Sequence, residues 1–345
     1  MSAPKARASR GAGRKFERVP LLDLQRQYQA IGEEVLAEIG RVCASQQFIL
    51  GSEVERLESE VGAFTGAAEA VGCASGTDAL WLSLLAAGVQ PGDVVVTTAF
   101  SFFASASSIV RAGARPMLMD IDPQMLNLDA GRVAEKLRSG RLRNLGALLP
   151  VHLYGQCADM DALGSLGEEF RVPIIEDAAQ AIGAKWRERG AGSLGTAGAF
   201  SFYPSKNLSA YGDAGLMTTN DAEIAERMRR LSNHGSSRRY HHEELGWNCR
   251  MDSIQAAVLS VKLRYVEQWN TQRRQHAELY DRLFVETGLA ARRGEGTSDS
   301  SGGFPVRLLR TDARAQHVFH QYVIRAHRRD ELREFLMARG IGTEI

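Results

Sequence analysis

Short apolar runs alternate with helix-forming stretches between residues 70 and 206, and this alternation limits the fold more than any other feature of the sequence. The predicted strands are Ala70–Cys73, Asp93–Thr98, Arg115–Asp120 and Leu145–Leu149. The first predicted helix between them ends at Gly88, and the next three span Ser101–Ala112, Asp129–Ser139 and Asp159–Phe170. Strands separated by helices pair in parallel, and apolar β-branched runs indicate burial on both faces. The sequence therefore predicts an α/β fold with a mostly parallel sheet between helices.

Two later apolar runs each lead to a polar residue. Val172–Ile175 precedes Asp177, and Ala199–Phe202 precedes Lys206. Because parallel strands end at the same edge of a sheet, we expect the carboxylate and the amine to lie close together. This pairing suits pyridoxal phosphate (PLP): a lysine binds its aldehyde covalently, and an aspartate keeps its pyridine nitrogen protonated so that the ring accepts electrons. Ser201, five residues before the lysine, can reach the cofactor phosphate.

Two other features follow strand ends. Ser75-Gly76-Thr77 opens a helix, and the free backbone N–H groups of such a turn can bind a phosphate. Alone this pattern is weak, because Ser and Thr at helix starts are mostly caps, but together with Lys206 and Asp177 it favours phosphate binding. Phe102 lies near the end of the next strand, where ligands of α/β sheets bind, although an aromatic side chain there can equally fill the core.

Three segments, SGTDAL, EDAAQA and SFYPSKNL, resemble the sugar aminotransferases of the DegT/DnrJ/EryC1/StrS family in order and spacing. This family is a branch of the fold-type I PLP enzymes, and the similarity extends roughly from Val19 to Ile345. It implies a PLP-dependent transferase fold of type I, with a mostly parallel seven-stranded sheet between helices and a smaller α+β C-terminal domain. It also implies a homodimer in which the active sites are shared.

The resemblance assigns cofactor roles to individual residues. Lys206 binds PLP and then moves a proton as general base and acid, while Asp177 keeps the pyridine nitrogen charged. Phe102 stacks on the ring, and Gln180 hydrogen-bonds the ring oxygen. The residues expected at the phosphate are Gly76, Thr77, Ser201 and, from the neighbouring subunit, Asn248.

Substrate contacts are expected from the polar segment Ser232–Arg250, which the sequence predicts to be an irregular loop. The resemblance implies that Arg250 binds a substrate carboxylate of the neighbouring site, and the planar guanidinium matches a carboxylate with two parallel hydrogen bonds. Arg239 and Tyr240 are further candidates, because the adjacent arginines of this loop favour an anionic acceptor. No metal site is expected, since neighbouring histidines on a loop diverge and no other ligand completes a set.

The chain divides into three predicted parts. Residues 1–18 form a basic tail that we expect to be disordered, although a nucleic-acid arm or transit peptide has the same composition. Residues 19–250 form the large PLP-binding domain, whose N-terminal helices, Leu21–Ser45 and Glu53–Thr65, help to build the dimer in the resembled family. Residues 251–345 form a linking helix and a small domain, which the resemblance implies is incomplete at Ile345 and lacks some substrate contacts.

Within that last part, the predicted elements are the helix Met251–Glu286, the flexible loop Ala290–Gly303, the strands Phe304–Leu309 and Val318–Arg325, and the helix Arg329–Arg339. In the large domain, Ser209 and Ala214 stand where the family usually has glycine. A positive φ at either position costs about 1 kcal/mol.

Composition excludes several classes of function. The 42 Lys and Arg residues balance 41 Asp and Glu, so no net charge draws the chain to nucleic acid or acidic membranes. No apolar run is long enough to cross a membrane. The four cysteines are scattered, which favours free thiols in a reducing cytoplasm.

The resulting functional hypothesis is transfer of an amino group from L-glutamate to a keto-sugar nucleotide, in the biosynthesis of amino sugars for surface polysaccharide or secondary metabolites. A PLP-dependent sugar dehydratase of the same family is disfavoured, because that branch is expected to carry histidine at the position of Lys206. A non-catalytic PLP-binding dimer partner or sensor is the alternative from another class. The sequence leaves the nucleotide and the position of the keto group open.

Overall fold

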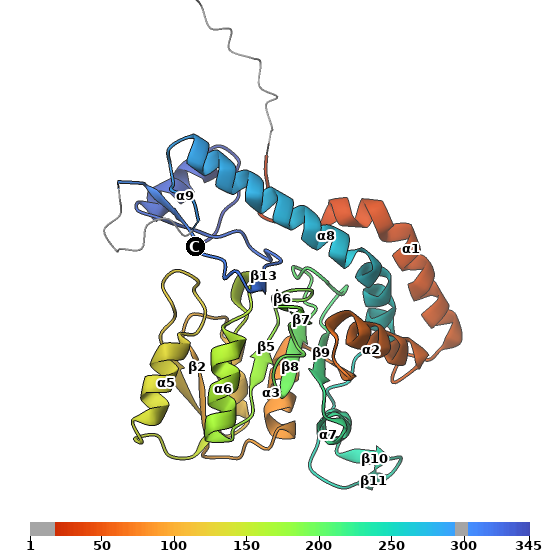
Figure 1. The fold of residues 1–345 in the computed structure, drawn as a ribbon. Coiled ribbons are helices and arrows are strands. Elements are labelled where there is room, and N and C mark those ends of the chain that lie inside the picture. The colour runs from red at the N-terminus through yellow and green to blue at the C-terminus, as the bar shows by residue number, and fades with distance from the viewer. Residues whose placement is uncertain (1–17, 294–302) are drawn as a thin grey trace, which may run out of the picture.

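The computed structural model describes residues 18–293 and 303–345, so the predicted tail and most of the predicted loop at Ala290–Gly303 lie outside the described residues. Its centre is a seven-stranded sheet with the order β1-β9-β8-β5-β4-β2-β3 (Figure 1). The strands are β1 (Glu69–Cys73), β2 (Val94–Thr98), β3 (Arg115–Met119), β4 (Leu145–Leu148), β5 (Ile175–Asp177), β8 (Ala197–Ser201) and β9 (Gly215–Thr219).

The sheet consists of a four-stranded and a three-stranded part. Isolated parallel bridges, Leu148 to Ile174 and Val151 to Asp177, join them between β4 and β5. Strand β9 runs antiparallel to both of its neighbours, and the other strands share one direction. The predicted mostly parallel, seven-stranded sheet is therefore confirmed.

Helices cover both faces of the sheet, as the apolar strands require. Successive residues of β2 illustrate this, because Val95 packs into the core beneath α3, α4 and α7, whereas Val96 packs into the core beneath α2, α5, α6 and α8. All five residues of β2 are buried. These helices are α2 (Ser52–Thr65), α3 (Gly76–Ala86), α4 (Ala104–Arg111), α5 (Ala130–Arg138), α6 (Met160–Phe170), α7 (Ala222–Ser232) and α8 (Ser253–Glu286). Among the described residues, no helix is both long and apolar enough to cross a membrane.

Helix α8 has 34 residues and is therefore about 50 Å long. It runs from the sheet to the C-terminal part of the chain, and α1 (Leu24–Ser45) packs along its first half (Figure 1). Ile31 and Val35 of α1 meet Val258 and Val261 of α8 in a separate small core. The linking helix was thus predicted correctly, to within two residues at its start.

The C-terminal part differs from its prediction. The predicted strand Val318–Arg325 is wrong: the structure has β13 (Ala315–Gln316), then irregular chain, then β14 (Ile324–Ala326), which pairs with β12 (Val306–Leu308). Phe319 has φ +45°, and Arg273 Nη1 of α8 donates to the carbonyl oxygens of Phe319 and His320, at 3.2 Å each. These contacts hold the segment against α8 instead of in a sheet. Helix α9 (Arg329–Met337) follows.

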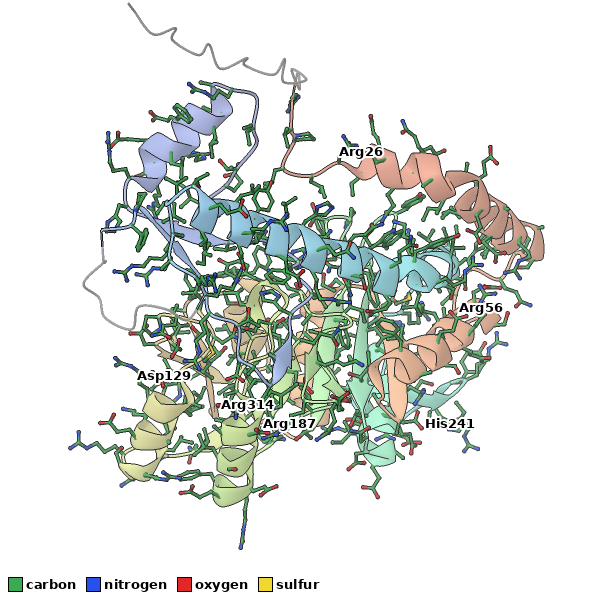
Figure 2. The ribbon with its side chains drawn as sticks, turned by 45° about the horizontal axis from the view of Figure 1, so that its top comes forward. Arg26, Arg56, Asp129, Arg187, His241 and Arg314 are labelled. Carbon is green, nitrogen blue, oxygen red and sulfur yellow. The ribbon has the colours of Figure 1, made fainter. Side chains whose placement is uncertain are left out.

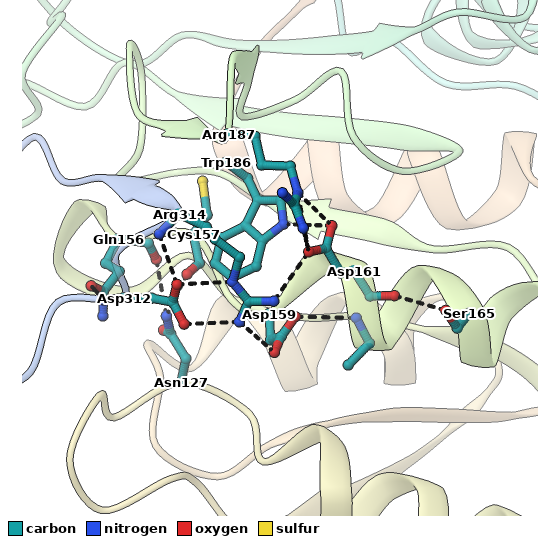
Figure 3. Close-up of polar contacts among 11 residues, drawn as sticks. Asn127, Gln156, Cys157, Asp159, Asp161, Ser165, Trp186, Arg187, Asp312 and Arg314 are labelled. Carbon is teal, nitrogen blue, oxygen red and sulfur yellow. Dashed lines mark hydrogen bonds and ion pairs between the residues drawn. The ribbon is translucent and has the colours of Figure 1, made fainter.

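Strand β13 pairs with an unpredicted hairpin, β6 (Lys185–Trp186) and β7 (Arg189–Gly190). Arg314, next to β13, makes ion pairs with Asp159, Asp161 and Asp312 and lies over the Trp186 ring (Figure 3). Arg187 binds Asp161 as well, so that Arg187 and Arg314 converge on one carboxylate (Figure 3). The two arginines are labelled next to each other in the view of the whole chain (Figure 2). This network joins the C-terminal part to the start of α6.

The segment Ser232–Arg250 is also more regular than predicted. It contains a small hairpin, β10 (Ser236–Arg238) and β11 (His241–His242), that projects beyond α7 (Figure 1). Tyr240 takes φ +66° in its turn. Both strands are very short and mostly exposed, so this segment has no alternating apolar pattern from which they could be predicted.

Candidate active site

Asp177 and Lys206 meet at the ends of neighbouring parallel strands. Asp177 is the last residue of β5, and Lys206 follows β8 by one short turn, in which the Lys206 N–H donates to the Tyr203 carbonyl at 2.8 Å. Burial lowers the pKa of the Lys206 amine, and the negative charge of Asp177 acts in the opposite direction. The amine is thus easier to deprotonate than an exposed lysine, as a proton-transferring group requires.

The carboxylate of Asp177 is held rigidly, with the residue only 5% exposed. Ser105 Oγ donates to Oδ2 at 2.7 Å, and the Ala179 N–H donates to Oδ1 at 3.2 Å. Ser105 lies in α4 and was not predicted as a site residue. The hydrogen bond from Ser105 fixes the orientation of the Asp177 carboxylate. A fixed carboxylate is what binding of a protonated ring nitrogen requires.

The turn at the start of α3 forms a cradle for an anion. Ser75 caps the helix by accepting from the Asp78 N–H at 3.1 Å, whereas Gly76 and Thr77 occupy the first helical positions, whose N–H groups have no intrahelical acceptor. A Cβ at Gly76 would lie 2.5 Å from the Cβ of Ser201, so only glycine allows this close approach. The Ser201 hydroxyl thereby stands beside the helix N-terminus, which fits a phosphate group.

A pocket of about 190 Å³ lies at the same edge of the sheet. Its lining residues are Ala99, Phe100, Ser101, Phe102, Leu153, Tyr154 and Gln180. Phe102 is 73% exposed and precedes α4 instead of lying within it, so its ring is free to stack on a planar ligand. Gln180 Oε1 accepts from the Tyr154 N–H at 2.6 Å, which leaves the Gln180 amino group as a donor for a ring oxygen.

Asn248 and Arg250 flank Cys249, whose backbone bonds to the end of the segment that leads into the cradle. Asn248 is exposed and forms a β-bridge with Asn233, and the adjacent Cys249 carbonyl accepts from the Ala74 N–H at 3.1 Å. Arg250 Nη1 donates to Asn233 Oδ1 at 3.2 Å, while its buried Nε has no acceptor among the described residues. An arginine with a free buried donor is suited to an anionic ligand.

Arg239 and Tyr240 are separate from these residues in the single chain. They form the turn of the β10–β11 hairpin, Tyr240 is 80% exposed, and the Arg239 guanidinium lies 5.1 Å from its ring centre. Neither residue lines the pocket of Phe102 and Gln180. The structure does not bring these two predicted substrate residues to the site within one chain.

The surroundings of three further residues are defined by the structure: His152, Ser209 and Ala214. His152 is fully buried: its Nδ1 accepts from the Ala158 N–H at 3.1 Å, so the proton is on Nε2, which lies 2.9 Å from Glu176. Ser209 and Ala214 do not have positive φ, so neither carries the strain considered above. Ser209 Oγ instead accepts from the buried Lys262 amine at 3.0 Å.

Together these features match one cofactor. A fixed buried carboxylate, a lysine of lowered pKa, an exposed aromatic ring and a phosphate cradle stand at one sheet edge. The fold and the site define a PLP-dependent transferase of fold type I.

Comparisons with known proteins identify the group more narrowly. Residues 29–345 match the DegT/DnrJ/EryC1/StrS aminotransferase family, and the chain belongs to this family of PLP-dependent aminotransferases. It is 46% identical to a "Pleiotropic regulatory protein" of Geobacillus stearothermophilus over 95% of this chain and 83% of that protein. It is 43% identical to the dTDP-3-amino-3,4,6-trideoxy-alpha-D-glucose transaminase of Streptomyces venezuelae over 94% and 81% of the two chains.

Among solved structures, S. venezuelae DesV in complex with a ketimine intermediate superposes with a TM-score of 0.85 at 40% identity, over 95% of this chain and 83% of that chain. Relatives named as UDP- and dTDP-sugar aminotransferases show that this chain is a transaminase of a group that acts on nucleotide sugars.

Proposed function

We propose that this protein transfers an amino group from L-glutamate to the keto carbon of a nucleotide-linked sugar, in the cytoplasmic biosynthesis of amino sugars for surface polysaccharide or secondary metabolites. The observation that carries the proposal is the convergence of Asp177 and Lys206 beside the pocket of Phe102 and Gln180. The names of the relatives support the substrate class. The non-catalytic alternative is not favoured.

Bound PLP would supply an electron-accepting ring. Asp177, fixed by Ser105 and Ala179, holds a proton on the ring nitrogen through its negative charge. Lys206 would hold the cofactor, and its amine would take up and return a proton at the substrate carbon, since burial favours the neutral amine. Phe102 and Gln180 fix the plane and rotation of the ring.

The phosphate end and the substrate end are formed by different residues. Gly76, Thr77 and Ser201 hold the phosphate at the start of α3, where backbone N–H groups and the helix dipole favour negative charge. We assign Asn248 to the phosphate and Arg250 to the carboxylate of the donor or acceptor in the neighbouring subunit.

The tip of the β10–β11 hairpin would complete the substrate end. Arg239 and Tyr240 lie at this exposed tip and do not line their own chain's pocket, and we propose that they contact an anionic acceptor bound in the neighbouring subunit.

A homodimer accounts for an exposed apolar surface on α1. This helix buries one face on α8, yet Leu24, Tyr28 and Leu36 remain 42 to 51% exposed in the single chain. A second copy that covers these side chains would form the homodimer that we propose.

Borohydride reduction of the PLP-loaded protein, followed by peptide mapping, tests the cofactor assignment. The pyridoxyl mass is expected on the peptide that contains Lys206, and a label on another lysine contradicts the proposal. The PLP-loaded protein is then incubated with labelled glutamate and a series of keto-sugar nucleotides. Mass spectrometry of the sugar products tests the acceptor class. If glutamate does not convert the bound PLP to its amine form, the proposal that L-glutamate is the amino donor is wrong.

A further inference from the structure

The residue that follows Lys206 is tied to two distant segments through its side chain. Asn207 Nδ2 donates to Asn270 Oδ1 of α8 at 2.8 Å and to the Val318 carbonyl at 3.4 Å. Asn207 Oδ1 lies 3.0 Å from Nδ1 of His320. Both asparagines are buried, so these bonds form where water does not compete for them.

The direction of this chain of bonds fixes the tautomer of His320. The Ile182 carbonyl can only accept, and Asn270 Nδ2 donates to it at 3.0 Å. Asn270 Oδ1 therefore faces Asn207 Nδ2, and Asn207 Oδ1 is left facing His320. Since an amide oxygen only accepts, His320 Nδ1 must carry the proton.

The imidazole of His320 is also kept neutral. Burial lowers its pKa to about 3, and the positive charges of Lys206 and Arg273 act in the same direction. Arg273 holds the backbone on either side through the Phe319 and His320 carbonyls. No described residue donates to Nε2, which stays an unprotonated acceptor.

The same segment is fitted tightly against the pocket wall. Gly155 has φ +100°, and a Cβ there would lie 2.7 Å from Val318 Cγ2 and 3.1 Å from both the Gln180 carbonyl oxygen and the His320 nitrogen. Residues 318–320 thus contact Gly155 and Gln180 on one side and bond to Asn207 on the other. If they shift, either the backbone at the pocket or the side chain of Asn207 must move with them.

We propose that His320 is a positioning residue for Lys206: its Nδ1–H fixes Asn207 and thereby sets the direction in which the lysine amine enters the pocket. Neighbouring Cα atoms are only about 3.8 Å apart, so rotation at Asn207 is transmitted directly to Lys206. A neutral ring does this without placing a second positive charge beside the amine. The inference rests on the role of Lys206 proposed above.

The tautomer can be tested without cofactor. In the full-length protein labelled with ¹⁵N-histidine, the His320 signals, identified by their loss in His320→Asn, should show a protonated Nδ1 and an unprotonated Nε2. They should not change between about pH 5 and pH 8, where an ordinary histidine titrates. A proton on Nε2, or a titration within that range, overturns the inference.

The consequence for Lys206 needs a matched pair of variants. Asparagine at position 320 keeps a donor near the place of Nδ1, whereas leucine removes it at similar volume. We expect His320→Asn to form the reducible PLP link to Lys206 at the parental rate, and His320→Leu to form it about tenfold more slowly, with a shifted pH midpoint. A folded His320→Leu variant with parental rate and midpoint overturns the proposal.

The outcomes separate the two claims. If the parent protein carries no pyridoxyl group on Lys206, the proposed function fails, whereas the tautomer measurement still decides the bond from His320 to Asn207. If His320→Leu does not fold, the tautomer together with the rate of His320→Asn decides: a rate reduced tenfold in this donor-retaining variant contradicts the inference.

Discussion

Asp177 is the residue whose charge the proposed chemistry depends on most directly. Asp177→Asn is nearly isosteric, yet its amide cannot serve as counter-ion to a protonated ring nitrogen. We expect conversion of bound PLP by glutamate to slow by about 10²–10³, with little change in thermal unfolding. Single-turnover absorbance measurements test this, and unchanged turnover in a variant that still binds PLP contradicts the role.

Ser105→Ala is the matched control for that experiment. It removes the 2.7 Å hydrogen bond to Asp177 but leaves the carboxylate in place. A loss of about tenfold is expected, because one orienting contact is missing while the charge remains. An effect as large as that of Asp177→Asn would mean that orientation, and not charge, dominates.

For individual residues, the sequence predicted which candidates lie at or just after strand ends, whereas their roles stay predictions. Asp177, Gly76, Ser201 and Phe102 could be placed because parallel strands end at one edge. Ser105 and His320 could not, because the contacts that define their roles join residues 72 and 113 positions apart. No local pattern encodes such distances.

Among the elements, α8 contains a buried amine without a carboxylate partner among the described residues. Lys262 is 2% exposed, donates to Ser209 Oγ, and lies 4.4 Å from the Tyr211 ring centre. Burial lowers its pKa to about 8, against about 10.4 in the unfolded chain. Between these values the unfolded state binds more protons, so stability rises with pH from about 8 to 10 and is reduced by the full amount below pH 8.

Lys262→Met should therefore stabilise the protein near pH 7 by about 1–2 kcal/mol, after subtraction of the lost hydrogen bond to Ser209. It should also abolish the rise in stability between pH 8 and pH 10. Urea unfolding at pH 7 and pH 9.5 measures both effects. Ser209→Gly, which leaves the amine without its acceptor, should be destabilising, and the prediction is wrong if the two variants shift stability in the same direction.

The network around Arg314 joins β13 to α6, and its contribution to stability also rises with pH, but in the acid range. Hydrogen bonds from Arg187, Trp186 and Arg314 lower the pKa of Asp161 to about 2. A lowered carboxylate pKa contributes stability above about pH 4, and this contribution is lost as the pH falls toward 2. The side chain is 38% exposed, so solvent screening reduces the contribution to about 1 kcal/mol.

Asp161→Asn should lower the free energy of unfolding by about that amount at pH 6, and the difference should shrink as the pH approaches 2. Glu169→Gln is the control, because it removes a surface ion pair with Arg138 that is open to solvent on both sides. Little change is expected there. Equal losses in the two variants would show that the network around Arg314 has no special role.

The order of helices and strands was predictable where elements are long and periodic, as in β2 or α8. The prediction failed for β6, β7 and β13, which contain two residues each, and β13 pairs with β6 from about 130 residues further along the chain. Their conformation is decided by Arg314 and Trp186, not by local preference. The same holds for residues 318–323, whose backbone follows Arg273.

For the whole molecule, the shared active site is the main prediction. Lys206→Ala and Arg250→Ala chains should each be inactive, but mixed dimers should recover part of the activity, because one of their two sites has both residues intact. Tagged co-purification confirms that the chains exchanged. Mixed dimers without turnover would place Arg250 in its own subunit's pocket or outside the chemistry.

Among the described residues, strand β1 pairs with β9 alone, and the two strands are separated by roughly 140 residues of chain. At typical rates of protein synthesis, β1 leaves the ribosome about 7 to 30 s before its partner exists. During that time its apolar residues and unpaired backbone edge are open to other chains. The cradle at Gly76 also needs Ser201 of β8. It can therefore form only after most of the large domain has been synthesised, long after β1, the strand that leads into it.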